Sequence, residues 1–179
     1  MFNFKFLARG SLDRIGPDFP VTHLFLFNKF LMRQLCKRKL KHFGEGAEIR
    51  PFSYLVGCSK ISIGNHTIIR SGSILMAEDQ DFFGGGIDIE DYVLMGSNCS
   101  IYTSNHNYSS AEKSIVSQGH KFYPDVRIET GAWVGANVII LPGVVIGKHS
   151  VIGAGSVVTK SIPAFKVAVG NPARVIKNI

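Results

Sequence analysis

A strict repeat of six residues constrains the fold of this chain more than any other feature of its sequence. From Ile128 to Pro163 the chain reads IETGAW, VGANVI, ILPGVV, IGKHSV, IGAGSV and VTKSIP. The first column is aliphatic and β-branched in every row: Ile128, Val134, Ile140, Ile146, Ile152 and Val158. An amphipathic α-helix repeats its apolar face about every 3.6 residues and a flat strand about every 2, so neither gives a period of six. Short strands joined by tight corners, as in a hexapeptide β-helix, do.

Two other columns of the repeat carry information about the coils. The second column holds glycine at 135, 147 and 153, and we expect these glycines to supply the positive φ that tight corners demand. The fifth column is small or apolar throughout: Ala132, Val138, Val144, Ser150, Ser156 and Ile162. Coils of this kind stack at roughly 4.8 Å, with the aliphatic column forming a continuous core. One coil cannot bury its own apolar residue, so we expect further repeats upstream and a cap at each end.

The period divides the chain into three parts. Residues 43–163 form the predicted β-helix, with two interruptions at 76–87 and 105–127 that we expect to be loops. Long loops on a regular scaffold commonly carry function. Residues 1–42 lack the period and are expected to form a helical or irregular cap, and residues 164–179 a tail that packs on the last coil. The predicted fold class is all-β. The upstream residues that keep the register are Ile63, Ile69, Leu75, Ile89, Met95 and Ile101.

The N-terminal cap is predicted to contain one basic amphipathic helix over residues 21–41. Its apolar positions recur at helical spacing, and cations occupy most of the remaining surface. One interpretation is a plug on the first open coil, and another is a surface that attaches to an anionic membrane. The apolar positions are Leu24, Phe27, Leu31 and Leu35, and the cations are Lys29, Arg33 and Lys37.

Charge and cysteine content narrow the partners and the setting. The net charge of +7 over 179 residues favours an anionic partner, such as a phosphate group or a membrane surface. No nucleic-acid recognition motif accompanies the charge, so we do not expect nucleic acid as a partner. The three cysteines have no metal-binding spacing, so we expect no metal site and a reduced, cytoplasmic setting. No apolar run approaches the roughly 18 residues that span a bilayer, and no signal peptide is evident.

His106 is the candidate for acid–base chemistry. It lies in YTSNHNYSS, directly after an in-register coil and at the base of the second interruption. A neutral imidazole can take a proton from a hydroxyl near neutral pH, which typically contributes about 10²–10⁴ to a rate. A purely structural role for this loop histidine remains the alternative at this point.

The C-terminal stretch resembles a known family. GAWVGANVIILPGVVIGKHSVIGAGSVVTKSIPAFKVAVGNPARVIKNI is similar to the C-terminal half of the hexapeptide-repeat acetyltransferases, in particular the maltose, galactoside and polysaccharide O-acetyltransferases. The resemblance covers residues 61–179 and is most specific in VTKSIP and GNPARVI. It implies a left-handed parallel β-helix of triangular section. It also implies a homotrimer that binds acetyl-CoA, its co-substrate, in a groove between adjacent subunits.

The resemblance assigns roles to individual residues on the donor side. His106 matches the family's catalytic histidine, which acts as general base while the acceptor hydroxyl attacks the thioester directly. Trp133 matches a residue of the active-site wall. Backbone contacts to the pantetheine arm fall on Ala136 and Ala154. The positions near the adenine and 3′-phosphate end of CoA are Thr159, Lys160 and Arg174.

The acceptor side departs from the family. Where the maltose-type enzymes carry an acceptor-binding asparagine, this chain has Arg70 and Ser71, which we take as substrate-site candidates. Asn105 and Tyr108 flank the predicted base and are candidates for orienting it or the sugar. The N-terminal segment also lacks resemblance to the family's acceptor-shaping segment. These differences put maltose or galactoside as the substrate in doubt.

The predicted function is transfer of acetyl from acetyl-CoA to a sugar hydroxyl, in the biosynthesis of a bacterial surface polysaccharide such as capsule, exopolysaccharide or lipopolysaccharide. One alternative is an O-acetyltransferase that acts on an antibiotic, and another is a non-catalytic β-helix that only binds its ligand. A zinc carbonic anhydrase on the same fold would need three converging histidines, and the spacing of the histidines offers no such set.

Overall fold

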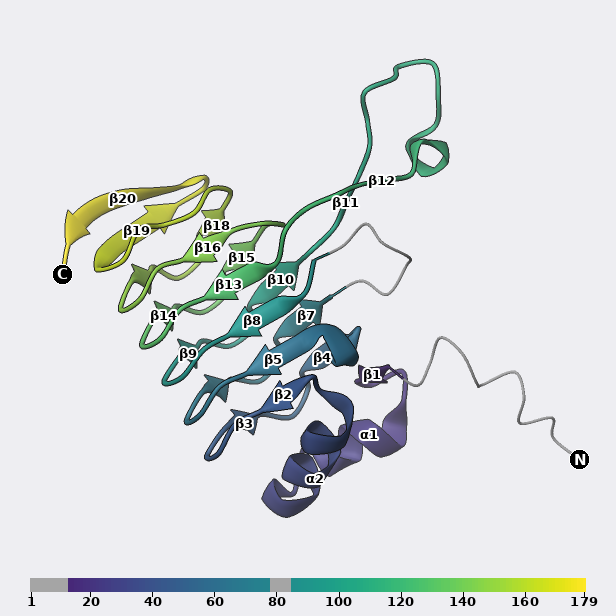
Figure 1. The fold of residues 1–179 in the computed structure, drawn as a ribbon, viewed down its shortest axis with the longest axis vertical. Coiled ribbons are helices and arrows are strands. Elements are labelled where there is room, and N and C mark those ends of the chain that lie inside the picture. The colour runs from purple at the N-terminus through teal and green to yellow at the C-terminus, as the bar shows by residue number, and fades with distance from the viewer. Residues whose placement is uncertain (1–12, 78–84) are drawn as a thin grey trace, which may run out of the picture.

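The chain winds into a three-faced parallel β-helix in the computed structural model, which describes residues 13–77 and 85–179. Short strands on three faces recur coil after coil, so that each face is a parallel sheet whose neighbouring strands come from successive coils (Figure 1). The helices cover one end of this prism, and the C-terminal strands close the other. The predicted all-β class is confirmed for the described residues.

The three faces follow one another in the order A, B, C along the chain. Face A contains β1 (Arg14–Ile15), which is antiparallel, then β4 (Tyr54–Val56), β7 (Ile74–Met76), β10 (Ser100–Tyr102), β15 (Ile139–Ile140) and β18 (Val157–Val158). Face B contains β2 (His42–Phe43), β5 (Ile61–Ile63), β8 (Ile87–Ile89), β13 (Val126–Ile128) and β16 (Val145–Ile146). Face C contains β3 (Glu48–Ile49), β6 (Ile68–Ile69), β9 (Leu94–Met95), β14 (Trp133–Val134), β17 (Val151–Ile152), β19 (Lys166–Gly170) and β20 (Ala173–Asn178).

The first and fifth columns of the repeat both point into the prism. All six first-column residues from Ile128 to Val158 are fully buried, and no fifth-column residue exceeds 5% exposure. The two serines of the fifth column each have a hydrogen-bond partner in the core. The Ser150 hydroxyl donates to the Pro163 carbonyl at 2.8 Å, and the Ser156 hydroxyl donates to the Gly153 carbonyl at 2.7 Å. The core is therefore continuous along the axis, as the period predicts.

The second-column glycines have a different role from the one predicted. Positive φ occurs two residues further on, in the fourth column, at Gly131, Asn137, Gly143, His149 and Gly155, and not at Gly135, Gly147 or Gly153. A Cβ on Gly135 would lie 2.6 Å from the Ala154 backbone nitrogen of the next coil. These glycines are needed because adjacent coils approach too closely for any side chain, so the prediction of positive φ was wrong.

The predicted single helix over residues 21–41 is two helices, α1 (Pro20–Phe25) and α2 (Lys29–Lys39). Asn28 separates them, because its side-chain oxygen accepts hydrogen bonds from the backbone N–H groups of Phe30 (3.0 Å) and Leu31 (3.1 Å) and so caps α2. The cap restarts the helix with a new phase, and of the predicted apolar stripe only Leu35 is buried. Leu24 and Phe27 are 64% and 58% exposed.

The inner face of α2 packs on the first coil through Met32, Leu35 and Cys36, which are buried against β2 and β3. The plug interpretation of this segment therefore fits the packing. No helix in the described part of the chain has the length and apolarity to cross a bilayer.

The two interruptions leave the prism at the same corner, between faces A and B. Most of the first, residues 78–84, lies outside the described residues. The second leaves after β10 and returns at β13, and it contains a small antiparallel hairpin of β11 (Asn105–His106) and β12 (His120–Lys121) with a 3₁₀ turn at Ile115–Gln118 between the strands. This hairpin projects beyond the stacked coils (Figure 1). At the other end of the prism, β19 extends face C and β20 folds back on β19.

Candidate active site

A groove of about 450 Å³ runs along face C, across successive coils. It exists because the residue that follows each strand of the face lacks a side chain in three coils in a row. These residues are Gly96, Gly135 and Gly153, and their equivalent in the preceding coil is Arg70. The strand side of the groove is lined by the outward residues Leu94, Trp133 and Val151, which are neighbours in register. Its other side is lined by Ser97, Ala136 and Ala154. The groove therefore fits a narrow, elongated ligand that lies parallel to the prism axis.

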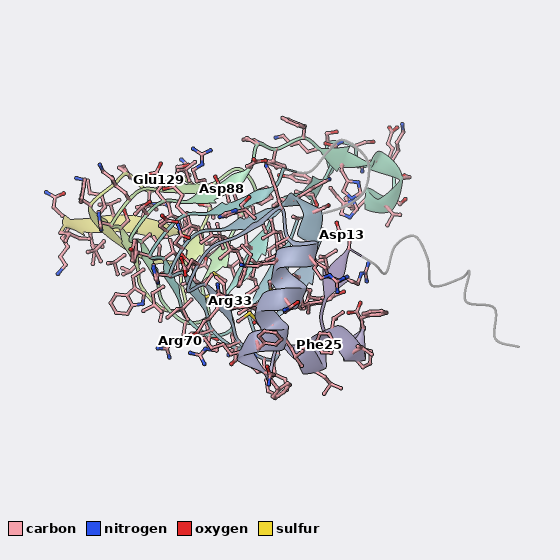
Figure 2. The ribbon with its side chains drawn as sticks, turned by 60° about the horizontal axis from the view of Figure 1, so that its bottom comes forward. Asp13, Phe25, Arg33, Arg70, Asp88 and Glu129 are labelled. Atoms are coloured by element: carbon pink, nitrogen blue, oxygen red, sulfur yellow. The ribbon has the colours of Figure 1, made fainter. Side chains whose placement is uncertain are left out.

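Trp133 and Arg70 are the two large polar or aromatic side chains of the groove. Trp133 is 53% exposed, so its ring offers an open flat surface rather than filling the core. Arg70 closes the end of the groove nearer the N-terminus, and its side chain projects outward from the prism (Figure 2). No hydrogen bond or ion pair holds the Arg70 guanidinium within the described residues.

The floor of the groove rests on a buried thiol. The Cys99 Sγ–H donates to the Gly135 carbonyl, with a sulfur–oxygen distance of 3.0 Å. Burial raises the pKa of this thiol, so Cys99 stays protonated. Cys36 and Cys58 are also buried, and burial likewise raises their thiol pKa, that of Cys58 to about 12. The cysteines are therefore core residues and do not supply a thiolate nucleophile.

His106 lies on β11 of the projecting hairpin, where its side chain is exposed. It pairs across the hairpin with His120, and the two imidazole centroids are 4.3 Å apart. Asn105, its neighbour on β11, accepts a hydrogen bond from the His106 backbone N–H at 3.0 Å through its side-chain oxygen. Tyr108 follows at the start of the loop and is 73% exposed. Asn105 and Tyr108 thus lie beside the histidine, and the former helps to fix its backbone.

Two amides hold the hairpin and its loop together. The Asn107 side-chain amide donates to the carbonyls of Gln118 and His120 at 3.2 and 3.1 Å. The Gln118 side chain accepts from the Ser110 N–H and donates to two loop carbonyls, all at 3.0 Å. The histidine is therefore carried by a defined loop and not by a free strand of chain.

The remaining predicted donor-side residues lie at the C-terminal end of the prism. Arg174 on β20 is opposite Val169 of β19, and Val169 touches the place where a side chain on Gly153 would lie. Arg174 is thus one strand pair from the end of the groove. Thr159 and Lys160 follow β18 at the corner between faces A and B, where both are exposed. Neither of these two lines the groove of the single chain.

The structure brings four predicted site residues into one groove and leaves the rest outside it. Arg70, Trp133, Ala136 and Ala154 line the groove, while His106 is on a hairpin that leaves from a different corner. Ser71 follows Arg70 at the groove corner and is half-buried without being part of the lining.

Seven groove residues were not predicted as site residues: Leu94, Gly96, Ser97, Gly135, Val151, Ile152 and Gly153. The signal was present, because MGSNCS aligns with VGANVI and IGAGSV when all the rows are stacked, and the second and third columns then define the groove. Within residues 13–77 and 85–179, no group of three histidine, cysteine or acidic side chains is arranged to hold a metal ion.

Comparison with known proteins places the chain among transferases. Residues 125–160 match the family described as bacterial transferase hexapeptide (six repeats). A galactoside O-acetyltransferase of Lactococcus lactis subsp. lactis is 37% identical over 147 residues, which cover 82% of this chain and 67% of that protein. A maltose O-acetyltransferase structure from Clostridium difficile 630 superposes with a TM-score of 0.77 at 33% identity, covering 87% of this chain and 81% of that one. A hexapeptide-repeat acetyltransferase from Vibrio cholerae O1 biovar eltor, in complex with acetyl-CoA, gives a TM-score of 0.74 at 28% identity, with 87% and 82% covered.

The prism of hexapeptide coils agrees with the class that the family match gives, a hexapeptide-repeat transferase. The chain belongs to the hexapeptide-repeat acetyltransferase family, which includes the galactoside and maltose O-acetyltransferases. The predicted left-handed parallel β-helix and the predicted enzyme class, an acetyltransferase, are confirmed with it.

Proposed function

We propose that this protein transfers acetyl from acetyl-CoA to a sugar hydroxyl in bacterial surface polysaccharide biosynthesis. The observation that carries the proposal is the groove on face C, whose floor is made of Gly96, Gly135 and Gly153. Such a floor lets an elongated acyl carrier lie against the backbone. Relatives named galactoside and maltose O-acetyltransferases supply the acceptor class, a sugar hydroxyl.

The pantetheine arm of acetyl-CoA would lie in the groove between Trp133 and the small residues Ala136 and Ala154. The groove fits this arm because its lining is largely apolar or small. The nucleotide end would extend toward the C-terminal end of the prism. There Arg174, Lys160 and Thr159 supply two cations and a hydroxyl for its phosphates.

His106 would act as the general base. The hairpin projects from the corner between faces A and B, whereas the groove lies at the end of the face C strands. The histidine of one subunit would therefore serve the groove of a neighbouring subunit. A homotrimer, in which three prisms pack around a threefold axis, gives each groove one such hairpin. Asn105 and Tyr108 would then face the acceptor from the same hairpin.

The reaction needs only one proton carrier on the protein. His106 takes the proton from the sugar hydroxyl as the hydroxyl oxygen forms a bond to the thioester carbonyl carbon. The carbon–sulfur bond then breaks, and the CoA sulfur leaves as the thiol after receiving that proton. No thiolate nucleophile is available in the groove, because Cys99 is buried and its thiol pKa is raised. Direct attack by the acceptor is therefore favoured over an acyl-enzyme.

The proposal is tested by incubating the purified protein with acetyl-CoA and a panel of acceptors, and by following the release of free CoA thiol. We expect release with at least one oligosaccharide or polysaccharide and none above background without an acceptor. CoA at about 100 times its dissociation constant should stabilise the fold by roughly 2.7 kcal/mol in a thermal melt. Release only with hydroxylated antibiotics would favour the drug-modifying alternative. CoA binding without release for any acceptor would favour a non-catalytic binding protein.

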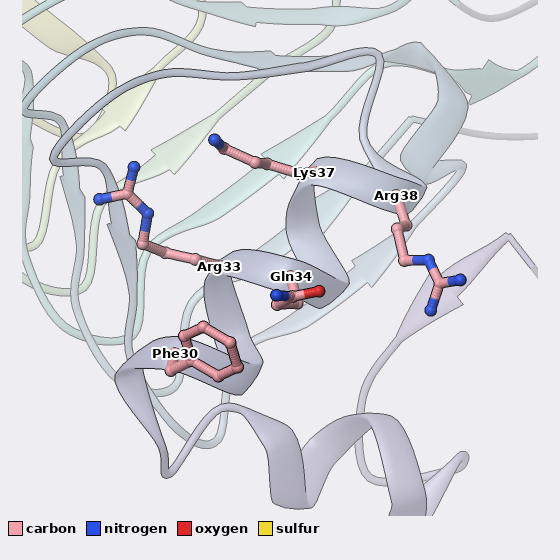
Figure 3. A pocket seen from close by; sticks show the side chains of 5 residues that line it. All are labelled: Phe30, Arg33, Gln34, Lys37 and Arg38. Atoms are coloured by element: carbon pink, nitrogen blue, oxygen red, sulfur yellow. The ribbon is translucent and has the colours of Figure 1, made fainter.

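The outer surface of α1 and α2 supports a second proposal, peripheral attachment to an anionic membrane. Leu24, Phe27 and Phe30 are each more than half exposed, and Arg33, Lys37 and Arg38 surround Phe30 on α2. Arg33 and Lys37 leave the helix on one side and Arg38 on the other (Figure 3). Apolar side chains beside cations are the pattern of a helix that lies in the headgroup region. Such attachment would bring the enzyme to a lipid-linked acceptor.

The double variant Lys37→Gln/Arg38→Gln is expected to weaken binding to vesicles that contain phosphatidylglycerol by roughly 30-fold, because each cation near an anionic surface contributes about 1 kcal/mol. Cosedimentation measures the bound fraction. Lys177→Gln on β20, at the opposite end of the prism, is the matched control and should bind as the wild type does. Equal binding of the wild type to neutral phosphatidylcholine vesicles would contradict the electrostatic part of the proposal.

A further inference from the structure

We propose that Arg70 recognises an anionic group of the acceptor, so that the sugar acetylated by this enzyme carries a carboxylate or a phosphate close to the reacting hydroxyl. The inference rests on the proposed function and names the substrate class of the same site.

Arg70 has no counter-charge within the described residues, a state that it shares with Arg33, Arg38 and Arg174. Three arginines on the prism and its cap are held by carboxylates at ion-pair distance: Arg14 by Asp18 (2.9 Å), Arg50 by Glu48 (2.7 Å) and Arg127 by Asp88 (3.4 Å). Within the described residues, the Arg70 side chain has neither an ion pair nor a hydrogen bond. Its five N–H donors therefore remain available to a ligand.

The groove itself gives Arg70 no negative neighbour. The other lining residues are Leu94, Gly96, Ser97, Trp133, Gly135, Ala136, Val151, Ile152, Gly153 and Ala154, and all of them are uncharged. The next recess of face C toward the N-terminus contains Lys29, Arg50 and Glu48, which adds one further net positive charge. The field at this end of the groove is therefore positive. An anion would be drawn to it more strongly than a neutral sugar would.

The position of Arg70 along the groove separates it from the donor's phosphates. Ala154, Ala136, Ser97 and Ser71 occupy equivalent corners in successive coils, so Arg70 lies three coil steps, or roughly 14 Å, from the level of Ala154. The cations proposed for the nucleotide, Lys160 and Arg174, are at the far end. A donor whose nucleotide lies at that far end has its thioester toward Arg70. The acceptor must then approach from the Arg70 end of the groove.

The chemistry of the side chain selects the kind of group. A guanidinium binds a carboxylate or a phosphate through two parallel hydrogen bonds, and such charge-assisted bonds are about twice as strong as neutral ones. The Ser97 hydroxyl lines the same part of the groove and can add a third contact. Uronic acids supply carboxylates, and sugar phosphates supply phosphates. Arg70 would bind either anion in the same way. Acceptors that carry one or the other therefore distinguish the two sources.

The test compares matched acceptors with and without the charge. Acetyl transfer is measured with methyl glucoside, methyl glucuronide and glucose 1-phosphate, and kcat/KM is determined for each. We expect the wild type to prefer at least one anionic acceptor over the neutral one by about 10- to 100-fold. In Arg70→Gln this preference should fall to about one. Arg127→Gln, which removes a guanidinium paired with Asp88 on face B and outside the groove, is the matched control and should keep the wild-type preference.

Each outcome separates this inference from the proposed function. Transfer to the neutral glycoside with equal or higher kcat/KM would overturn the inference and leave the acetyltransferase proposal intact. A rise in KM for acetyl-CoA in Arg70→Gln, with the acceptor preference unchanged, would assign Arg70 to the donor and also overturn it. Absence of transfer to every acceptor, including polysaccharides, would overturn the proposed function and this inference with it. Preference for the glucuronide or for the phosphate identifies the source of the charge.

Discussion

His106→Ala is expected to lower kcat for acetyl transfer by about 10²–10⁴-fold, the usual contribution of a positioned general base. Without the imidazole, the acceptor hydroxyl must attack the thioester while still carrying its proton. The fold should persist, because the side chain is exposed on a hairpin outside the core. The measurement is the initial rate of CoA thiol release at saturating acetyl-CoA, with circular dichroism to show that the coils are intact.

A second histidine provides the control for this variant. His149 is also exposed but lies at the corner between faces B and C, where its ring stacks on Phe165. His149→Ala should therefore keep the wild-type rate. CoA binding should survive in His106→Ala, since the residues proposed to hold the pantetheine arm, Trp133, Ala136 and Ala154, are unchanged. A wild-type rate in His106→Ala would contradict the base assignment.

An assay on mixed subunits tests where the base acts. His106→Ala removes the base, and replacing Ala136 with a bulky residue, as in Ala136→Trp, blocks the groove. If the base of one subunit serves the groove of its neighbour, refolding the two inactive variants together restores some activity. A mixture that stays inactive would place the base and the groove of each site in one chain.

The core could be predicted from the sequence because its signal is local and repeated. Each first-column residue from Ile128 to Val158 faces the axis, and the period of six has no competing explanation among helices and flat strands. The second-column glycines were misread for a physical reason. A glycine can be required by φ or by the closeness of another strand, and only the stacking of coils shows that Gly135 faces the Ala154 backbone.

The site was only partly predictable, because it depends on which coils meet. Trp133, Ala136 and Ala154 came from the family resemblance, and the register of face C places them in one groove with Arg70. The pairing of His106 with His120 joins residues across a long loop, and no periodicity reports such a contact. The break between the two helices at Asn28 was also not predicted from the apolar spacing. The Asn28 side chain caps a new helix there even though the apolar spacing continues across it.

Ile140→Ala is expected to lower the free energy of unfolding by about 2–5 kcal/mol, the range for removing a large aliphatic side chain from a core. Ile140 is fully buried on β15, in register with Ile101 of the preceding coil and Val158 of the next. The cavity that the variant leaves would interrupt the apolar column in the middle of the prism. A rigid stack of coils has little freedom to collapse around it, so the loss should be near the upper end. Urea denaturation followed by circular dichroism gives the measurement.

The adjacent residue supplies the matched control, because it has the same side chain on the same strand. Ile139 points away from the axis and is 37% exposed. Ile139→Ala removes the same atoms but leaves no internal cavity, and we expect a loss of about 1 kcal/mol. The difference in the free energy of unfolding between the two variants measures the stability gained by pointing the isoleucine side chain into the core. If Ile139→Ala were as destabilising as Ile140→Ala, the first column would not form the core, and the six-residue period would have to reflect something other than the burial of one column.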